Sequence, residues 1–107
     1  MTLEPVAVPA VPLSAALDDP AAVPYFLWDE PMTVAELRRR LAEGSPAERR
    51  RLLAKILREA RDIEVWRFTT PREVKQRWSE LAPLLGRRRP FWEFLLREWE
   101  RQGLLPS

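Results

Sequence analysis

The stretch that decides the fold is SPAERRRLLAKILREAR, residues 45–61. Its aliphatic side chains recur at helical spacing and fall on one stripe, which is typical of an amphipathic helix packed on a core. Ser45 and Glu48 form a capping box at its start, and Pro46 stands at the first helical position, where its missing N–H costs nothing. The sequence therefore predicts a helix over about residues 46–61. The stripe consists of Leu52, Leu53, Ile56, Leu57 and Ala60.

The same start signal occurs twice more along the chain. Thr33 is followed by Glu36, and Thr70 by Glu73, so each pair forms a capping box that predicts the first turn of a helix. A further helix is expected to start at Pro90. The expected ranges are about 34–43, 71–82 and 90–102, and residues 62–68 form a packed connection.

Glycine and proline mark the expected helix ends. Gly44 follows the first helix at a position where a left-handed residue is wanted. Pro83 ends or kinks the third helix, Gly86 closes the turn after it, and Gly103 stops the last helix.

Length and composition bound the function. A chain of 107 residues is one domain at most. With no histidine and no cysteine, it lacks the ligands of typical zinc and iron–sulfur sites, cysteine nucleophiles, His-based triads and disulfides. Residues 1–31 hold five acidic and no basic side chains, whereas residues 32–107 carry a net charge of +7. The basic part suggests an anionic partner or an acidic leader that covers it.

Residues 1–24 are expected to form a flexible, acidic, proline-rich leader, because five prolines oppose both helix and central strand. The leader has no basic n-region and its apolar stretch is interrupted by proline, so we expect neither a signal peptide nor a membrane helix. A cytoplasmic location is the default expectation.

The next block, Tyr25–Pro31, places three aromatic residues and a leucine in one run. A run this apolar is rarely left in water. We expect it to fold back as a strap on the core of the domain, and a docking peptide for a partner is the alternative.

These features together predict an all-α fold. We expect a small bundle of about four helices in a domain at residues 25–107, behind the leader at residues 1–24. The predicted core is Leu37, Leu41, Leu52, Leu53, Ile56, Leu57, Val65, Val74, Trp78, Leu81, Leu85, Phe91, Leu95 and Trp99.

The last helix carries more aromatic residues than a small core needs. Aromatic side chains with neighbouring arginines are typical anchors of protein interfaces, although a wide core stripe explains many of them. Phe94 lies outside the main stripe. The candidate partner-binding residues are Phe26, Trp28, Trp92, Phe94 and Trp99.

Two basic groups are candidates for contact with nucleic acid. One lies on the face of the 46–61 helix opposite its leucine stripe, and the other is a triplet just before the last helix, where a helix N-terminus adds positive potential. The third and fourth helices with the turn between them could form a helix-turn-helix. Against this, the exposed side of the last helix carries three glutamates. The candidates are Arg51, Lys55, Arg58, Arg87, Arg88 and Arg89.

Catalysis fits the sequence poorly. It contains no nucleophile elbow, phosphate-binding loop or glycine-rich fingerprint. The acidic pairs Asp18–Asp19 and Asp29–Glu30 lie in or beside the leader, whereas a catalytic carboxylate needs a fixed, partly dry site. We expect no enzyme activity, no cofactor and no bound metal.

Four segments resemble a family of short bacterial helical proteins. These are the tetrapeptide Phe26–Asp29, the stretch through Ile56-Leu57-Arg58, the helix start at Thr70–Trp78, and the turn Arg87–Trp92 that ends in a Phe-Trp pair. Members are encoded beside nucleotidyltransferase toxins of the abortive-infection type. The resemblance covers roughly residues 25–96 and carries no site residues over.

The resemblance implies an antitoxin-like partner that binds and neutralises such a toxin. The alternative is a small DNA-binding regulator, and the two overlap because antitoxins often bind their own operator. Salt separates them, since DNA binding weakens steeply with salt and an aromatic interface does not.

Overall fold

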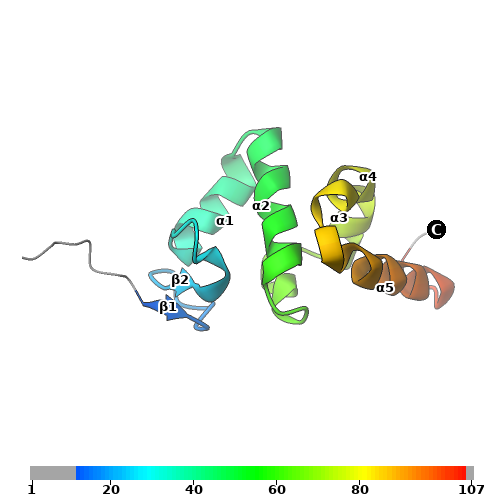
Figure 1. Ribbon diagram of the computed structural model, residues 1–107, viewed down its shortest axis with the longest axis horizontal. Helices are drawn as coiled ribbons and strands as arrows, with labels where there is room; N and C mark the ends of the chain where they lie inside the picture. Colours follow the sequence, from blue (N-terminus) through cyan, green and yellow to red (C-terminus); the bar gives the residue numbers. More distant parts are fainter. Residues whose placement is uncertain (1–11, 106–107) are drawn as a thin grey trace, which may run out of the picture. The chain divides into compact units, whose positions relative to one another are not determined.

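The computed structural model describes residues 12–105 and confirms the all-α class. The described residues divide into two compact units between Leu37 and Arg38, inside the first helix. Figure 1 shows the elements in chain order. The described helices are α1 (Val34–Glu43), α2 (Pro46–Glu59), α3 (Pro71–Gln76), α4 (Trp78–Leu81) and α5 (Arg89–Arg101), with 3-10 helices η1 (Tyr25–Leu27), η2 (Glu64–Arg67), η3 (Ala82–Leu84) and η4 (Gly86–Arg88).

The first unit begins earlier than the sequence predicts. Strand β1 (Leu13–Ser14) pairs in parallel with β2 (Val23–Pro24), and Leu17 between them is buried. The carbonyl of Ala22 accepts a hydrogen bond of 2.8 Å from the N–H of Val34. The predicted boundary at residue 24 is therefore no break in the structure, because residues 12–24 pack with the segment that follows. Residues 1–11 of the predicted leader lie outside the described residues.

The expected strap is a short 3-10 helix, η1. Its Phe26 and Leu27 are buried, and the ring of Phe26 meets that of Tyr25 edge-on at 5.4 Å. Trp28 is the exception, because 63% of it is exposed. The run thus buries its middle and leaves its last aromatic residue in solvent.

Helix starts lie where the sequence places them. The hydroxyls of Thr33, Ser45 and Thr70 each accept a 3.1 Å hydrogen bond from the amide three residues on. In a capping box the glutamate carboxylate accepts from the backbone amide of the capping residue, but at two of these helix starts the carboxylate has another donor. The Glu48 carboxylate accepts from Arg40 at 3.4 Å, and the Glu73 carboxylate accepts from the Thr69 hydroxyl at 2.5 Å.

Gly44 ends α1 for a reason other than the one predicted. Its φ is not positive, unlike that of Gly86 (53°) and Gly103 (77°). A Cβ at Gly44 would lie 2.5 Å from the carbonyl oxygen of Arg40 and 2.6 Å from a carboxylate oxygen of Glu48. Glycine is therefore needed there for close approach and not for a left-handed backbone.

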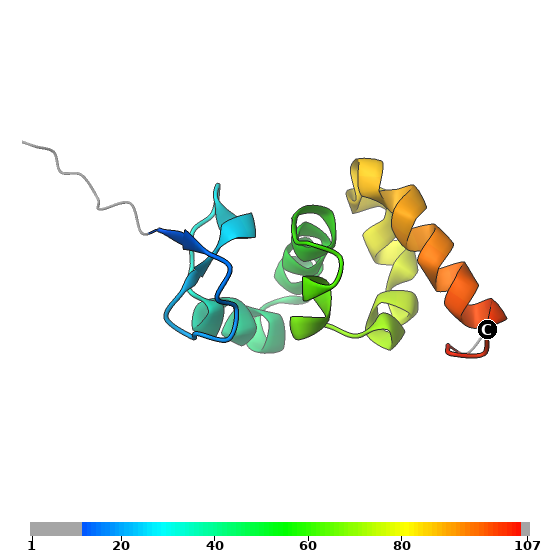
Figure 2. The ribbon, with the colours of Figure 1, turned by 90° about the horizontal axis from the view of Figure 1, so that it is seen from below.

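The predicted helix 71–82 is broken. It is observed as α3, then α4, then η3, with Arg77 (φ −105°, ψ 14°) between α3 and α4. The interruption precedes Pro83, so the proline is not its cause, and no glycine or proline at residue 77 signals it. Figure 1 shows α3 and α4 close together. Unlike this broken segment, α5 is one uninterrupted helix (Figure 2).

Burial follows the predicted stripes in most places. None of the predicted core residues is exposed, although Leu41, Trp78, Phe91, Leu95 and Trp99 are only half-buried. Among the described residues, no helix is long and apolar enough to cross a membrane. Buried residues that the predicted core did not include are Leu17, Val23, Pro24, Phe26, Leu27, Met32, Val34, Ala54, Lys55, Ala60, Thr69, Ala82, Trp92, Leu96 and Leu105.

Candidate functional site

Trp92 is the central buried residue of α5, and its assignment as a partner-binding residue is wrong. Its side chain is fully buried, and its indole N–H donates a 2.8 Å hydrogen bond to the carbonyl of Leu57 at the end of α2. A tryptophan with a satisfied N–H inside a small core is a packing residue. Trp92 therefore ties α5 to α2.

Trp66 of η2 connects Trp92 to the surface of the second unit. Its ring meets Trp92 edge-on with centroids 5.6 Å apart, and Trp99 at 5.8 Å. Such edge-on pairs are favourable beyond their buried area. Trp99 is consequently half-buried and held in place by a neighbouring ring.

Two shallow grooves share Trp99 as a lining residue. One, of about 460 Å³, is also lined by Thr70, Pro71, Arg72, Leu104 and Leu105. The other, of about 220 Å³, is lined by Asp62, Ile63, Trp66, Trp92 and Leu95 together with Trp99.

We call these two grooves and their shared residue the Trp99 surface. Ile63 in the smaller groove is 78% exposed, and Leu104 in the larger groove is 65% exposed. Apolar side chains gathered around a fixed aromatic ring are more informative than apolar residues scattered singly. The sequence prediction included Trp99 but missed Ile63, Trp66 and Leu104, which become neighbours of Trp99 only in the fold.

The other aromatic candidates for partner binding differ in their exposure and position. Phe26 is buried, so the structure contradicts its assignment to a partner interface. Phe94 is 61% exposed but lines neither groove. Trp28 is exposed but belongs to the first unit. Of the predicted aromatic residues, Trp99 lines both grooves and is half-buried, whereas Trp92 borders the smaller groove but is fully buried.

Ionic contacts hold the polar side of α5. Glu100 pairs with Lys75 of α3, and Glu98 pairs with Arg101. Hydrogen bonds from Gln102 and Arg101 hold the pKa of the Glu98 carboxyl below its ordinary value. Arg72, in contrast, lines the larger groove as an exposed cation.

The predicted basic face of α2 is interrupted. Lys55 is only 5% exposed, so its assignment as a nucleic-acid contact is wrong. Arg58 donates a 3.2 Å hydrogen bond to the carbonyl of Leu84 and pairs with Glu59 at 3.1 Å. Arg51 remains exposed. The sequence misses the burial of Lys55 because this residue lies beside the leucine stripe on a helix that is covered over a wide arc.

The arginine triplet at the start of α5 is also divided. Arg87 and Arg89 are exposed, but Arg88 is half-buried with its guanidinium 4.6 Å from the ring centroid of Phe91 and 5.7 Å from that of Trp92. Nε and Nη2 of Arg88 are buried without a hydrogen-bond partner. These nitrogens are buried beside aromatic rings, so only part of the Arg88 guanidinium is open to a phosphate backbone.

Comparison of the chain with protein-family models, curated proteins and solved structures gives no match. Within residues 12–105, no group of three or more acidic residues is placed to hold a metal ion. The Trp99 surface is the feature of the described helices best suited to contact another molecule through apolar side chains.

Proposed function

We propose that this chain is a non-enzymatic, cytoplasmic protein-interaction module, the antitoxin-like partner of a nucleotidyltransferase-type toxin. The Trp99 surface is the face that we assign to the partner. The observation that carries the proposal is the exposure of Ile63 and Leu104 in two grooves that share Trp99, whose ring packs against Trp66. The resemblance described above supplies the class of partner.

The surface has the physical properties of an interface hot spot. Tryptophan residues dominate such spots when they stand in a desolvated centre surrounded by other contacts. Trp66 already holds the ring of Trp99 in place, so binding orders little that was free before. The two grooves offer room for apolar side chains of the partner.

Charge favours a partner with an acidic periphery. Residues 38–107 contain 18 basic and 10 acidic side chains, a net charge of +8. A second copy of the same unit carries the same net positive charge, which disfavours self-association. A partner with an apolar centre and acidic surroundings is complementary.

DNA binding is the second candidate, favoured by the exposed Arg51, Arg87 and Arg89. The buried Lys55 and the partly buried guanidinium of Arg88 reduce the number of phosphates that these groups can neutralise. Fewer phosphate contacts mean weaker binding and a shallower salt dependence. The protein interface is therefore the stronger proposal.

Co-expression with a nucleotidyltransferase-type toxin encoded by the neighbouring gene tests the proposal. The chain is expected to restore growth and to co-purify with the toxin. Leu104→Ser and Ile63→Ser are expected to weaken the complex at least tenfold, about 1.4 kcal/mol each, because each places a polar group in an apolar contact.

Leu84→Ser is the matched control, since Leu84 is also exposed but lines neither groove. Phe94→Ala tests whether the interface extends around α5. Failure of the unaltered chain to neutralise the toxin rejects the antitoxin role. Equal losses in the Leu84 and Leu104 variants reject the Trp99 surface as the interface.

A further inference from the structure

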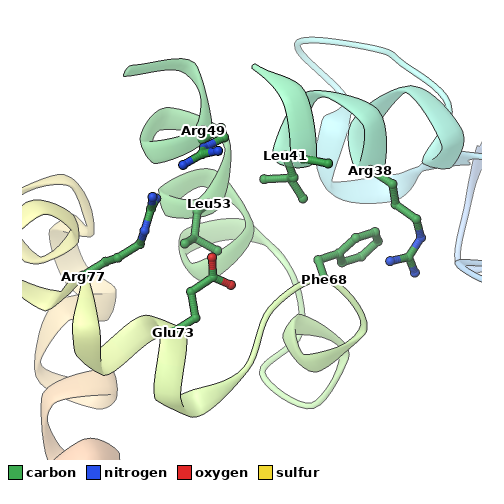
Figure 3. A pocket seen from close by; sticks show the side chains of 8 residues that line it. Arg38, Leu41, Arg49, Leu53, Phe68, Glu73 and Arg77 are labelled. Carbon is green, nitrogen blue, oxygen red and sulfur yellow. The ribbon is translucent and has the colours of Figure 1, made fainter. Parts of the chain in front are cut away.

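A second pocket in residues 38–107 is lined mainly by arginines and apolar side chains. It measures about 360 Å³. Arg38 comes from α1, Arg49 from α2, and Arg77 from the break between α3 and α4 (Figure 3). The remaining lining residues are Leu41, Ala42, Leu53, Phe68 and Glu73. We call it the arginine pocket.

Arg49 and Arg77 are its unusual members. Both are half-buried and their guanidinium groups approach the same space from two helical segments (Figure 3). Within residues 12–105, neither side chain has a hydrogen bond or an ion pair. The carboxylate of Glu48, next to Arg49 in the sequence, is engaged by Arg40. Two partly buried cations without acidic partners form a ready site for an anion.

The other side of the pocket is fixed in place. The guanidinium of Arg38 lies 4.7 Å from the ring centroid of Phe68 and donates a 2.8 Å hydrogen bond to the carbonyl of Arg67. Leu41 adds apolar surface on this side, and Leu53 lies between it and the two arginines Arg49 and Arg77 (Figure 3). This side suits a flat or apolar organic group.

Glu73 sets the charge balance. Three arginines and one glutamate line the pocket, so its formal charge is +2. A phosphate monoester carries close to two negative charges at neutral pH and presents three acceptor oxygens. A carboxylate carries only one charge, so it neutralises half of this lining.

We propose that the arginine pocket binds a small phosphate monoester, with the phosphate between Arg49 and Arg77 and the organic group against Leu53 and Phe68. Guanidinium groups are well suited to phosphate oxygens because they donate several parallel hydrogen bonds. The site is separate from the Trp99 surface, so it does not depend on the proposed toxin partner.

Phenyl phosphate is the probe that tests the site. Its binding is measured from the shifts of amide and arginine side-chain resonances in NMR spectra of the full chain. It is expected to bind about tenfold more tightly than inorganic phosphate, because its ring adds apolar contact with the pocket. Benzoate, with one charge, is expected to bind more weakly than phenyl phosphate. Resonances of Leu53 and Phe68 should shift with phenyl phosphate.

Arg49→Gln and Arg77→Gln are each expected to weaken phenyl phosphate binding about tenfold or more, the loss typical of a hydrogen bond to a charged group. Arg50→Gln is the matched control, because it removes the same charge from α2 but lines no part of the pocket. Its affinity should stay within about twofold of the unaltered chain. Unchanged spectral dispersion shows that each variant is folded.

Glu73→Gln has the opposite expected effect. It removes the negative charge and keeps an oxygen that can accept from the Thr69 hydroxyl, so phenyl phosphate should bind about threefold more tightly or better. Equal losses in the Arg49, Arg50 and Arg77 variants would indicate nonspecific attraction and overturn the site. So would the absence of shifts at Leu53 and Phe68.

Discussion

The Trp99 surface and the arginine pocket lie in the same unit but use opposite chemistry. The Trp99 surface gathers apolar side chains around a ring that packs against Trp66, and the arginine pocket gathers guanidinium groups around a hollow. α3 and the residues at its ends contribute to both, since Pro71 and Arg72 line the larger groove and Glu73 and Arg77 line the pocket. The comparison shows how one short helix can serve two ligands of unlike polarity.

The largest expected effect concerns the Trp99 surface, the apolar one of the two sites. Trp92→Ala removes the ring beneath the Trp99 surface and leaves the carbonyl of Leu57 without its donor. We expect a loss of about 3–5 kcal/mol in the free energy of unfolding, the range for a large buried aromatic residue.

Chemical denaturation measures the loss, and Phe94→Ala is its control. Phe94 stands two residues further along the same helix but is exposed, so its truncation should change stability by less than about 0.5 kcal/mol. Similar midpoints for the two variants would contradict the described packing of α5.

Salt gives the next largest effect and sharpens the comparison. Raising ionic strength from about 0.05 to about 0.5 M shortens the screening length severalfold. We expect phenyl phosphate binding to weaken about tenfold, or about 1.4 kcal/mol, and toxin binding to change less than about threefold. Titration calorimetry at both salt concentrations measures the two responses. Parallel responses would show that charge dominates both sites.

A smaller effect is expected at the start of α3. Thr70→Ala removes the hydroxyl that accepts from the Glu73 amide and should cost about 1 kcal/mol of stability. Thr70→Ser retains the hydroxyl and should restore most of it. Because α3 lines both sites, the alanine variant should weaken both ligands, and thermal unfolding with each ligand present tests this.

Much of the fold is readable from the sequence because helix signals are local. The start of α1 at residue 34 and that of α2 at residue 46 follow from capping residues within a few positions of each helix. The stripe of Leu52, Leu53, Ile56 and Leu57 predicts most of the buried face of α2 in the same way. Local chemistry suffices wherever a feature is formed by neighbours in sequence.

The candidate sites are harder to predict because they are formed by tertiary contacts. Arg49 and Arg77 converge from segments 28 positions apart, and neither belongs to the basic groups singled out from the sequence. The aromatic pattern of α5 contains Trp92 and Phe94 alike, yet only the fold separates the buried ring from the exposed one. The spacing of apolar residues identifies a broad buried face of a helix but not the residues at which burial ends.

The smallest expected effect concerns pH at the end of α5. Because the pKa of Glu98 is lowered in the folded state, its contribution to stability is present above the unfolded value and is lost as pH falls through the folded value. Glu98 and Arg101 both lie near the surface, so the change in the free energy of unfolding is slight. Glu98→Gln should remove this part of the acid dependence, which carboxyl resonances followed by NMR can check.

The spacing of Trp66, Trp92 and Trp99 has an optical consequence. With centroids 5.6 and 5.8 Å from Trp66, the three indoles lie close enough for their electronic transitions to couple and to exchange excitation energy. The circular dichroism of the native protein should therefore carry an exciton couplet superimposed on the helical signal. Loss of that couplet reports the separation of η2 from α5, a single docking event that the helical signal averages over the whole chain.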